Sequence, residues 1–255
     1  MDRVFISIGS FNIYWYSVLI IISILLGYLL ARKQLIKNNI DKSFFDNMFF
    51  YMIIIGIIGA RIYYVIFNYQ EFNSIKDILA IYNGGLAIYG GVIAAIIFIY
   101  FYVKKHKYNF LTILDILAPS LILGQAIGRW GNFFNQEAYG SFVSLDFLNK
   151  LHIPNFVVNN MYINGNYHHP TFLYESFFCI IGFIILLLIR NKIKYKKGDI
   201  AFIYLIYYGI VRFFIEGLRM DSLYLFSFRI SQIVSLLLII IGVIGIIYNR
   251  KKNKK

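Results

Sequence analysis

Long apolar runs separated by short polar segments dominate this chain. Seven runs approach the ~20 residues that a helix needs to cross a bilayer. They are Ile13–Leu30, Phe45–Phe67, Ile88–Val103, Leu111–Ile127, Phe172–Ile189, Ile200–Gly217 and Ile230–Tyr248. The pattern predicts an all-α integral membrane protein with seven transmembrane helices, organised as a single membrane domain over residues 1–255. The third and fourth runs are short and contain glycine or proline, so we expect them to be tilted, broken or shielded from lipid by their neighbours.

Composition supports a membrane protein, and charge placement excludes a nucleic-acid partner. The chain is 60% hydrophobic and 15% charged, which is far too apolar for a soluble domain of this length. A formal charge of +13 is compatible with nucleic-acid binding only if the basic residues share one face. Here they sit in short tracts between the apolar runs, so we expect a lipid bilayer and no nucleic acid as partner.

The same basic tracts predict the orientation in the membrane. Most Lys and Arg residues fall in the segments 31–43, 104–110, 190–198 and 249–255, whereas the alternate segments hold only Arg3, Lys76 and Lys150 in open loops. The two sets alternate across all seven runs, so the positive-inside rule places the N-terminus outside and the C-terminus in the cytoplasm. The segment 141–169 has no clear period and is expected to form a small extracytoplasmic head or lid.

A cluster of polar residues follows the fourth apolar run. The segment Gly128–Gly140 contains an arginine, two asparagines and a glutamate. Charged groups at membrane depth cost roughly 2.5–3.5 kcal/mol each, so they persist mainly where they face a cavity and bind a ligand. The alternative is a polar re-entrant turn that only ties helices together.

Further acids and bases lie in or beside the apolar runs. The acids are Asp115, Glu137, Glu175 and Glu216, and the bases are Arg61, Arg129, Arg212 and Arg219. They could form structural ion pairs, but such pairs rarely stabilise an apolar interior more than apolar packing does, which favours a functional site. Tyr208, Arg212, Glu216 and Arg219 have spacings of 4, 4 and 3, which place them on one helix face.

Two other features carry weaker signals. His168 and His169 are adjacent, but no Cys or carboxylate spacing beside them completes a zinc site. We therefore expect no metal and no cofactor. Glycine pairs at 84–85 and 90–91 flank Tyr89, which indicates either a backbone that bends near a ligand or close packing of helices through small residues.

The polar segment resembles a family signature. Residues 128–140 match Gly-Arg-x-Gly-Asn-Phe-x-Asn-x-Glu-x-x-Gly, the pattern of the prolipoprotein diacylglyceryl transferase family, at every specified position. The resemblance extends over the whole chain and includes Trp15-Tyr16, Gly59-Ala60-Arg61, Gly84-Gly85-Leu86, Tyr89-Gly90-Gly91, Asp115, His169-Pro170 with Leu173-Tyr174-Glu175, and Tyr208-Gly209-x-x-Arg212-x-x-x-Glu216-x-x-Arg219. Seven spans with an external N-terminus also fit that family.

This resemblance implies a reaction and its partners. Phosphatidylglycerol would donate its diacylglyceryl group to the lipobox cysteine thiol of a preprolipoprotein, giving a thioether and releasing glycerol phosphate. The expected location is the bacterial cytoplasmic membrane, with the active site toward the extracytoplasmic side. No cofactor is implied.

The resemblance also implies roles for individual residues. The expected catalytic residues are Arg129, Arg212, Tyr89 and Glu137. The two arginines would clamp the phosphate, because a guanidinium matches phosphate oxygens in a two-pronged fashion. Glu137 and Glu216 would fix these arginines. The expected substrate-binding residues are Arg129, Asn132, Asn135, Gly140, Tyr16, Tyr208, Glu216, Arg219 and His169.

Tyr89 departs from a common form of the family pattern. Many members have histidine before this glycine pair, so a histidine general base cannot be transferred to this chain. A thiol of pKa ~8.5 needs about 2 kcal/mol to be half ionised at pH 7, whereas a phenol of pKa ~10 needs about 4 kcal/mol. We therefore expect Tyr89 to position the substrate or relay a proton.

A second hypothesis is a seven-helix transporter or channel for an anionic solute, in which the arginines line a pathway. It favours internal repeats and paired broken helices, and no convincing repeat is visible. A retinal-type receptor is disfavoured, because the last run holds no lysine.

Overall fold

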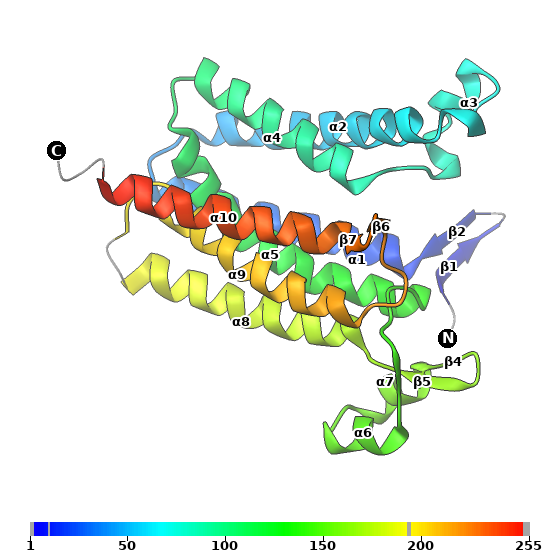
Figure 1. The fold of residues 1–255 in the computed structure, drawn as a ribbon. Coiled ribbons are helices and arrows are strands. Elements are labelled where there is room, and N and C mark those ends of the chain that lie inside the picture. The colour runs from blue at the N-terminus through cyan, green and yellow to red at the C-terminus, as the bar shows by residue number, and fades with distance from the viewer. Residues whose placement is uncertain (1–2, 10, 193–194, 252–255) are drawn as a thin grey trace. The chain divides into compact units, whose positions relative to one another are not determined.

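The structure is a computed structural model that describes residues 3–9, 11–192 and 195–251. Parts of two basic segments, at 193–194 and 252–255, lie outside the described residues. The chain forms two compact units, Met1–Ala31 with Leu114–Lys255, and Arg32–Ile113. Figure 1 shows the elements of both units, which are described in turn.

Seven of the described helices are long and apolar enough to cross a membrane, as the sequence predicts. They are α1 (Trp15–Lys37), α2 (Lys42–Phe67), α4 (Ile88–Lys105), α5 (Phe110–Asn135), α8 (Thr171–Lys192), α9 (Asp199–Leu218) and α10 (Ile230–Lys251). The fourth is longer than predicted, because α5 continues through Pro119 and beyond Ile127 to Asn135. Most of the polar signature is therefore helical, which rules out a re-entrant turn over residues 128–135.

The expectation of an all-α chain needs correction, because short strands lie before the first long helix and in two of the connections between later ones. β1 (Val4–Ile8) and β2 (Phe11–Tyr14) form an antiparallel hairpin, and β6 (Tyr224–Leu225) and β7 (Phe228–Arg229) form another. A small sheet has the order β3 (Phe142–Val143), β5 (Asn166–His168), β4 (Tyr162–Ile163). The first predicted helix wrongly included Ile13 and Tyr14, because a short apolar strand cannot be distinguished from a helix start by hydrophobicity alone.

The segment 141–169 folds into a small head with a core of its own. It holds α6 (Leu145–Lys150) and α7 (Asn155–Asn160) besides the small sheet. Leu148 and Val157 are fully buried in one cluster with Phe133 of α5 and Phe172 of α8. Aromatic residues at the ends of two long helices therefore tie the head to the membrane-spanning part of its unit.

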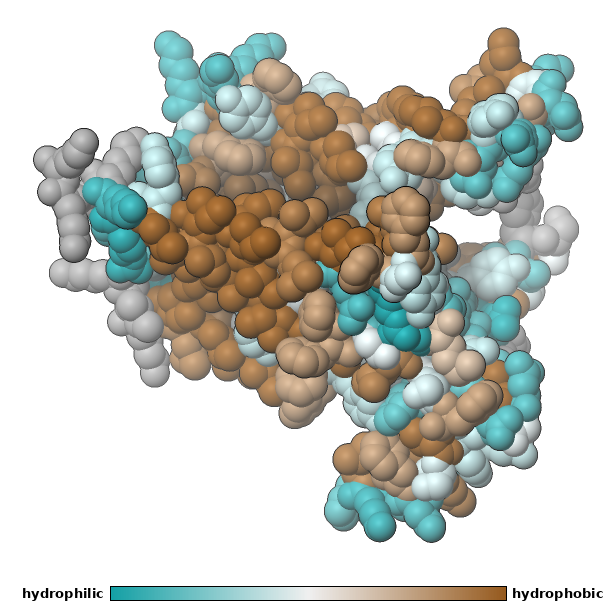
Figure 2. All heavy atoms as spheres, viewed as in Figure 1, coloured by the Kyte–Doolittle hydropathy of each residue, from teal (hydrophilic) through white to brown (hydrophobic). Residues whose placement is uncertain are grey.

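In the same unit, α8, α9 and α10 lie side by side (Figure 1). Small residues allow the close contact of α9 with α10, since a Cβ atom on Gly209 would lie 2.9 Å from the Ser235 carbonyl oxygen. The outward surface of these helices is apolar (Figure 2), and Phe214 on α9 is 69% exposed. Such a large apolar surface is stable when lipid covers it.

In the second unit, α2 and α4 pack through glycines. A Cβ atom on Gly91 would lie 3.1 Å from the Gly56 carbonyl oxygen, and one on Gly90 would clash with Tyr63. The glycine pair after Tyr89 therefore serves close helix packing, one of the two alternatives that the sequence leaves open.

The connection between α2 and α4 is held by one arginine. It contains α3 (Ile75–Leu79) and two short 3-10 turns, Tyr69–Glu71 and Ile81–Asn83. Arg61 of α2 is 7% exposed and donates to the carbonyl oxygens of Asp77, Ile78 and Gly84, each at 2.7 Å. Gly84 has a φ of +87°, a conformation that favours glycine. Arg61 is thus accounted for by loop anchoring.

Candidate active site

Four charged residues of the first unit gather at one end of its long helices. Arg129 lies near the C-terminus of α5, Glu175 near the N-terminus of α8, and Arg212 and Glu216 near the C-terminus of α9. Because neighbouring helices that run in opposite directions bring one C-terminus beside the next N-terminus, residues distant in sequence meet here. Ser231 at the start of α10 completes the group.

Glu175 is the centre of the cluster and is 1% exposed. Its Oε1 forms an ion pair with Arg129 Nη2 at 2.9 Å and accepts from the Tyr208 hydroxyl at 3.1 Å, while its Oε2 accepts from Arg212 Nη1 at 3.1 Å. One buried carboxylate therefore orients two guanidinium groups. From the sequence Glu175 is only an acid in an apolar run with no assigned role. Its place at the start of the fifth run is the signal that could have found it.

A second carboxylate continues the network. Glu216 is also 1% exposed. It forms an ion pair with Arg212, lies 3.9 Å from Arg219 Nη1, and accepts a hydrogen bond from Arg229 at its main-chain carbonyl. Arg219 in turn binds Asp221 through two hydrogen bonds of 2.9 Å. The predicted face of α9 is confirmed for Tyr208, Arg212 and Glu216, which all join this network.

Glu137 occupies a different place from the one expected. Its Oε1 accepts from the side-chain amides of Asn132 at 2.8 Å and Asn135 at 3.3 Å. Arg129 instead pairs with Glu175 and donates to Asn132 Oδ1 at 3.2 Å. Glu137 therefore reaches Arg129 through Asn132, and its expected role in fixing the arginines stays a prediction. The asparagine stands between them because residues 129, 132 and 135 lie about one turn apart on α5.

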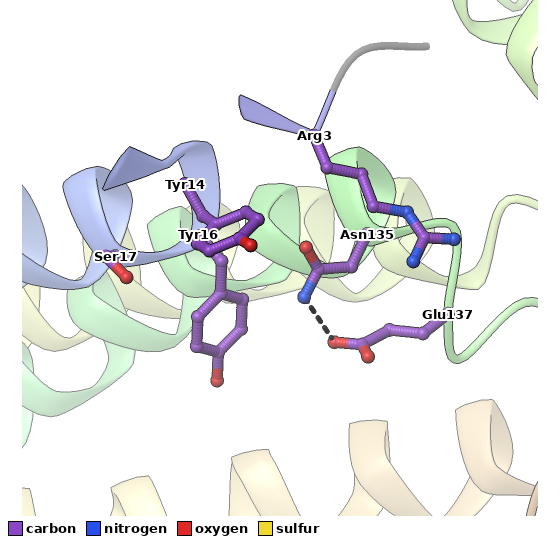
Figure 3. Close-up of a pocket in the computed structure, with 6 residues that line it drawn as sticks. All are labelled: Arg3, Tyr14, Tyr16, Ser17, Asn135 and Glu137. Atoms are coloured by element: carbon purple, nitrogen blue, oxygen red, sulfur yellow. Dashed lines mark hydrogen bonds between the residues drawn. The ribbon is translucent and has the colours of Figure 1, made fainter. Parts of the chain in front are cut away.

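A pocket of ≈ 310 Å³ opens beside Glu137. It is lined by Arg3, Tyr14, Tyr16, Ser17, Asn135 and Glu137. Figure 3 shows these side chains, with Asn135 bonded to Glu137 and the hairpin residues above them. Gly131 allows Tyr16 to reach this place, since a Cβ atom there would lie 2.6 Å from Tyr16 Cδ2.

Gly140 and His169 lie together at the base of the head. The Gly140 amide donates to the His169 carbonyl at 2.9 Å, and a Cβ atom on Gly140 would lie 2.6 Å from His169 Cβ. His169 Nδ1 lies 3.3 Å from the Tyr174 hydroxyl, and burial lowers the pKa of the His169 imidazole. This geometry supports a packing role for Gly140 and a neutral His169 near pH 7.

Two further residues singled out from the sequence have other surroundings. Tyr89 is in the first turn of α4, in the second unit, and is half-buried. Asp115 is buried, and its carboxylate accepts from the amides of Gly198 at 2.6 Å and Ala201 at 2.9 Å, which caps the start of α9. Asp115 is therefore explained as a structural carboxylate.

The cluster is suited to binding an anionic group. The side chains of Arg129 and Arg212 remain 21% and 12% exposed, so neither side chain is fully enclosed by the groups that orient it. No group of three or more possible metal-ligating His, Cys, Asp or Glu residues occurs in the part of the chain that the structure describes.

The fold and this cluster define a class: a multi-span helical membrane protein with arginines and carboxylates clustered at one end of its helices. Comparison with known proteins gives the family. The model of the prolipoprotein diacylglyceryl transferase family matches residues 3–248, and the chain belongs to this family. The membership selects a transferase over a transporter or channel for an anionic solute.

Curated relatives agree over nearly the full length. A phosphatidylglycerol–prolipoprotein diacylglyceryl transferase of Staphylococcus aureus is 48% identical over 99% of this chain and 90% of the relative. Proteins of the same name from Halalkalibacterium halodurans and Listeria monocytogenes are each 46% identical over 99% of this chain, covering 88% and 91% of the respective relative.

Proposed function

We propose that Arg129 and Arg212, oriented by Glu175, stabilise the leaving phosphate in the phosphatidylglycerol–prolipoprotein diacylglyceryl transferase activity of this chain. The observation that supports this most directly is the shared carboxylate. Two guanidinium groups from different helices bind the two oxygens of one buried side chain. Their remaining donors are thereby held in a fixed relation, as a preorganised anion site requires.

The reaction explains why two arginines at the phosphate would speed the transfer. The thiol sulfur of the lipobox cysteine attacks the glycerol carbon that carries the phosphate, and a C–S bond forms as the C–O bond breaks. The bonding electron pair stays with the phosphate oxygen, and the thiol proton is released. The phosphodiester of charge about −1 becomes a monoester approaching −2. Because negative charge grows on the phosphate, the arginines bind the transition state more strongly than the substrate, which lowers the barrier.

The polar residues beside Arg129 are proposed to hold the lipid head group. Asn132 contacts both Arg129 and Glu137, so it connects the phosphate clamp with the pocket. Asn135, Glu137 and Tyr16 line that pocket. Tyr208 donates to Glu175, which supports a role in orienting the clamp. Glu216 and Arg219 extend it, and His169 would line the approach from the head.

Tyr89 is proposed to position the substrate or relay a proton. The thiol requires only a small shift toward the thiolate near neutral pH, and the positive field of two arginines favours the charged form. A phenolate base would need a larger shift. This role for Tyr89 is argued from the pKa values of a thiol and a phenol alone.

We propose the cellular setting from the charge alternation. The basic tracts place the C-terminus in the cytoplasm and the N-terminus outside. The arginine cluster and the 141–169 head share the end of the helices that would face the extracytoplasmic side. There the site meets phosphatidylglycerol of the bacterial cytoplasmic membrane and secreted preprolipoproteins.

The direct test supplies both substrates. Protein in vesicles is incubated with labelled phosphatidylglycerol and a lipobox peptide, and label transfer to the peptide is measured. Arg129→Ala should lower turnover by about a hundredfold or more, the size of one lost transition-state contact. Lys150→Ala on the exposed head is the matched control and should be near neutral. Normal turnover of Arg129→Ala would rule out the assignment.

A further inference from the structure

The pocket beside Glu137 contains a residue to which neither the signature nor the mechanism assigns a role. Arg3 lies at the start of the N-terminal hairpin and lines the pocket together with Ser17 and Tyr14. From the sequence alone, Arg3 is only a basic residue in the segment that precedes the first apolar run. All six lining residues carry a polar group, among them one guanidinium and one carboxylate, which is unusual for a pocket at the end of apolar helices.

Aromatic stacking places the hairpin that carries Arg3 over the signature. Phe5 packs edge-on against Trp15 with ring centroids 4.6 Å apart, and Trp15 stacks on Phe134 at 4.8 Å. The Arg3 carbonyl accepts from the Trp15 amide at 3.1 Å. These contacts join β1, the start of α1 and the end of α5 within one compact unit. The position of Arg3 at the pocket is therefore supported by packing at both ends of the hairpin.

We propose that this pocket is the subsite for the glycerophosphate part of phosphatidylglycerol, and that Arg3 binds this group and the glycerol phosphate released from it. The inference rests on the proposed function of the Arg129 clamp. Asn132 links that clamp to Glu137, so a phosphate at Arg129 would direct its glycerol toward the pocket. A glycerophosphate group has about ten non-hydrogen atoms, and ≈ 310 Å³ is at the lower end of the ~300–1,000 Å³ typical of ligand pockets.

The chemistry of the lining matches a diol attached to an anion. Both amide hydrogen bonds to Glu137 reach Oε1, and among the described residues no hydrogen bond reaches Oε2. A carboxylate oxygen in this state accepts from hydroxyl groups. Ser17 and Tyr14 supply further hydroxyls, and the Arg3 guanidinium supplies donors and positive charge (Figure 3).

The charge of Arg3 predicts which step it affects most. The leaving group changes from about −1 to about −2, so its attraction to a nearby guanidinium grows after the C–O bond breaks. Arg3 lies beside the glycerol part and not at the reacting carbon in this arrangement. Its removal should therefore weaken binding of the product more than binding of the donor, and should lower kcat far less than the loss of Arg129, which is proposed to stabilise the phosphate at the breaking bond.

The test compares Arg3→Ala, Arg3→Lys and Ser17→Ala with Lys150→Ala as control. Binding of sn-glycerol 1-phosphate to the purified full chain in detergent is measured by titration calorimetry, with inorganic phosphate as the second probe. We expect Arg3→Ala to weaken glycerol phosphate binding about tenfold and Arg3→Lys to restore most of it. In the transfer assay, Arg3→Ala should raise KM for phosphatidylglycerol about threefold to fivefold, with kcat within about twofold.

Donor choice tests recognition of the glycerol itself. Phosphatidylmethanol has the same phosphodiester but no diol, so Ser17→Ala should reduce the preference for phosphatidylglycerol over phosphatidylmethanol about threefold to tenfold. Equal binding of glycerol phosphate by Arg3→Ala and Lys150→Ala, or glycerol phosphate bound no better than inorganic phosphate by the unaltered chain, would overturn the inference. If the unaltered chain binds glycerol phosphate in this way but Arg129→Ala keeps normal turnover, the proposed function fails while the subsite stands.

Discussion

Replacing Glu175 with glutamine separates two explanations of how the arginines act. The substitution keeps the shape of the side chain but removes its charge and one acceptor oxygen. In the structure the two carboxylate oxygens face Arg129 with Tyr208 on one side and Arg212 on the other. A glutamine NH2 group must therefore point at one guanidinium, which can only donate, so at least one arginine loses its partner.

The expected fall in kcat follows from the loss of one arginine's partner. A hydrogen bond to a charged group contributes about 1.5–3 kcal/mol, and the loss of one aligned donor at a developing anion costs about 2.7–4 kcal/mol in mutagenesis. If Glu175 acts by orienting the arginines, kcat should fall about a hundredfold, which corresponds to about 2.7 kcal/mol. If only net charge mattered, removal of the Glu175 charge would strengthen phosphatidylglycerol binding, and KM would fall with kcat kept.

The assay measures kcat and KM with labelled phosphatidylglycerol and a lipobox peptide, per folded molecule. Because a buried partner of two charges is removed, Tm is measured in parallel. Asp115→Asn is the matched control, since Asp115 is a buried carboxylate that caps α9. It should lower Tm and leave the kcat of the folded fraction within about threefold. Unchanged kcat with a lower KM in Glu175→Gln would refute the orienting role.

Three further outcomes are expected. Tyr89→Phe should retain much of the activity and Tyr89→His should leave the basic limb of the pH–rate profile in place; a severe Phe defect with a His-shifted limb would make Tyr89 the base. Cysteine labelling should reach position 150 in Lys150→Cys from outside and position 197 in Lys197→Cys only from the cytoplasm; labelling of both from one side contradicts the seven-span topology. Burial raises the pKa of Asp221, but its hydrogen bonds with Arg219 and the charge of that guanidinium outweigh burial and hold the pKa below its usual 3.8. The stability that this carboxylate contributes is therefore complete above pH 3.8 and is lost as the pH falls through the lowered pKa. The Tm difference between the unaltered chain and Asp221→Asn should thus be present near neutral pH and vanish in strong acid, and a difference that persists there would contradict the coupling.

The membrane-spanning architecture could be predicted from sequence because it depends on local properties. Length and continuity of apolar runs decide whether a helix crosses a bilayer, and neither requires a tertiary contact. The signature at Gly128–Gly140 and the spacing from Tyr208 to Arg219 likewise identified the site region, since an intramembrane charge is costly wherever its partner lies. The short strands were missed because a few extended residues leave no distinct period.

The partner of each charge was decided only by the tertiary structure. From the sequence Glu137 is expected to fix the arginines. In the structure its carboxylate accepts from two asparagines of α5, and Arg129 pairs with Glu175 on α8. Arg61 and Asp115 carry the same composition signal as the site residues, yet they hold backbone groups. Ion pairing depends on distances of a few ångströms between helices far apart in the chain. That information is absent from hydrophobic periodicity, which records only the face that each helix turns toward its neighbours.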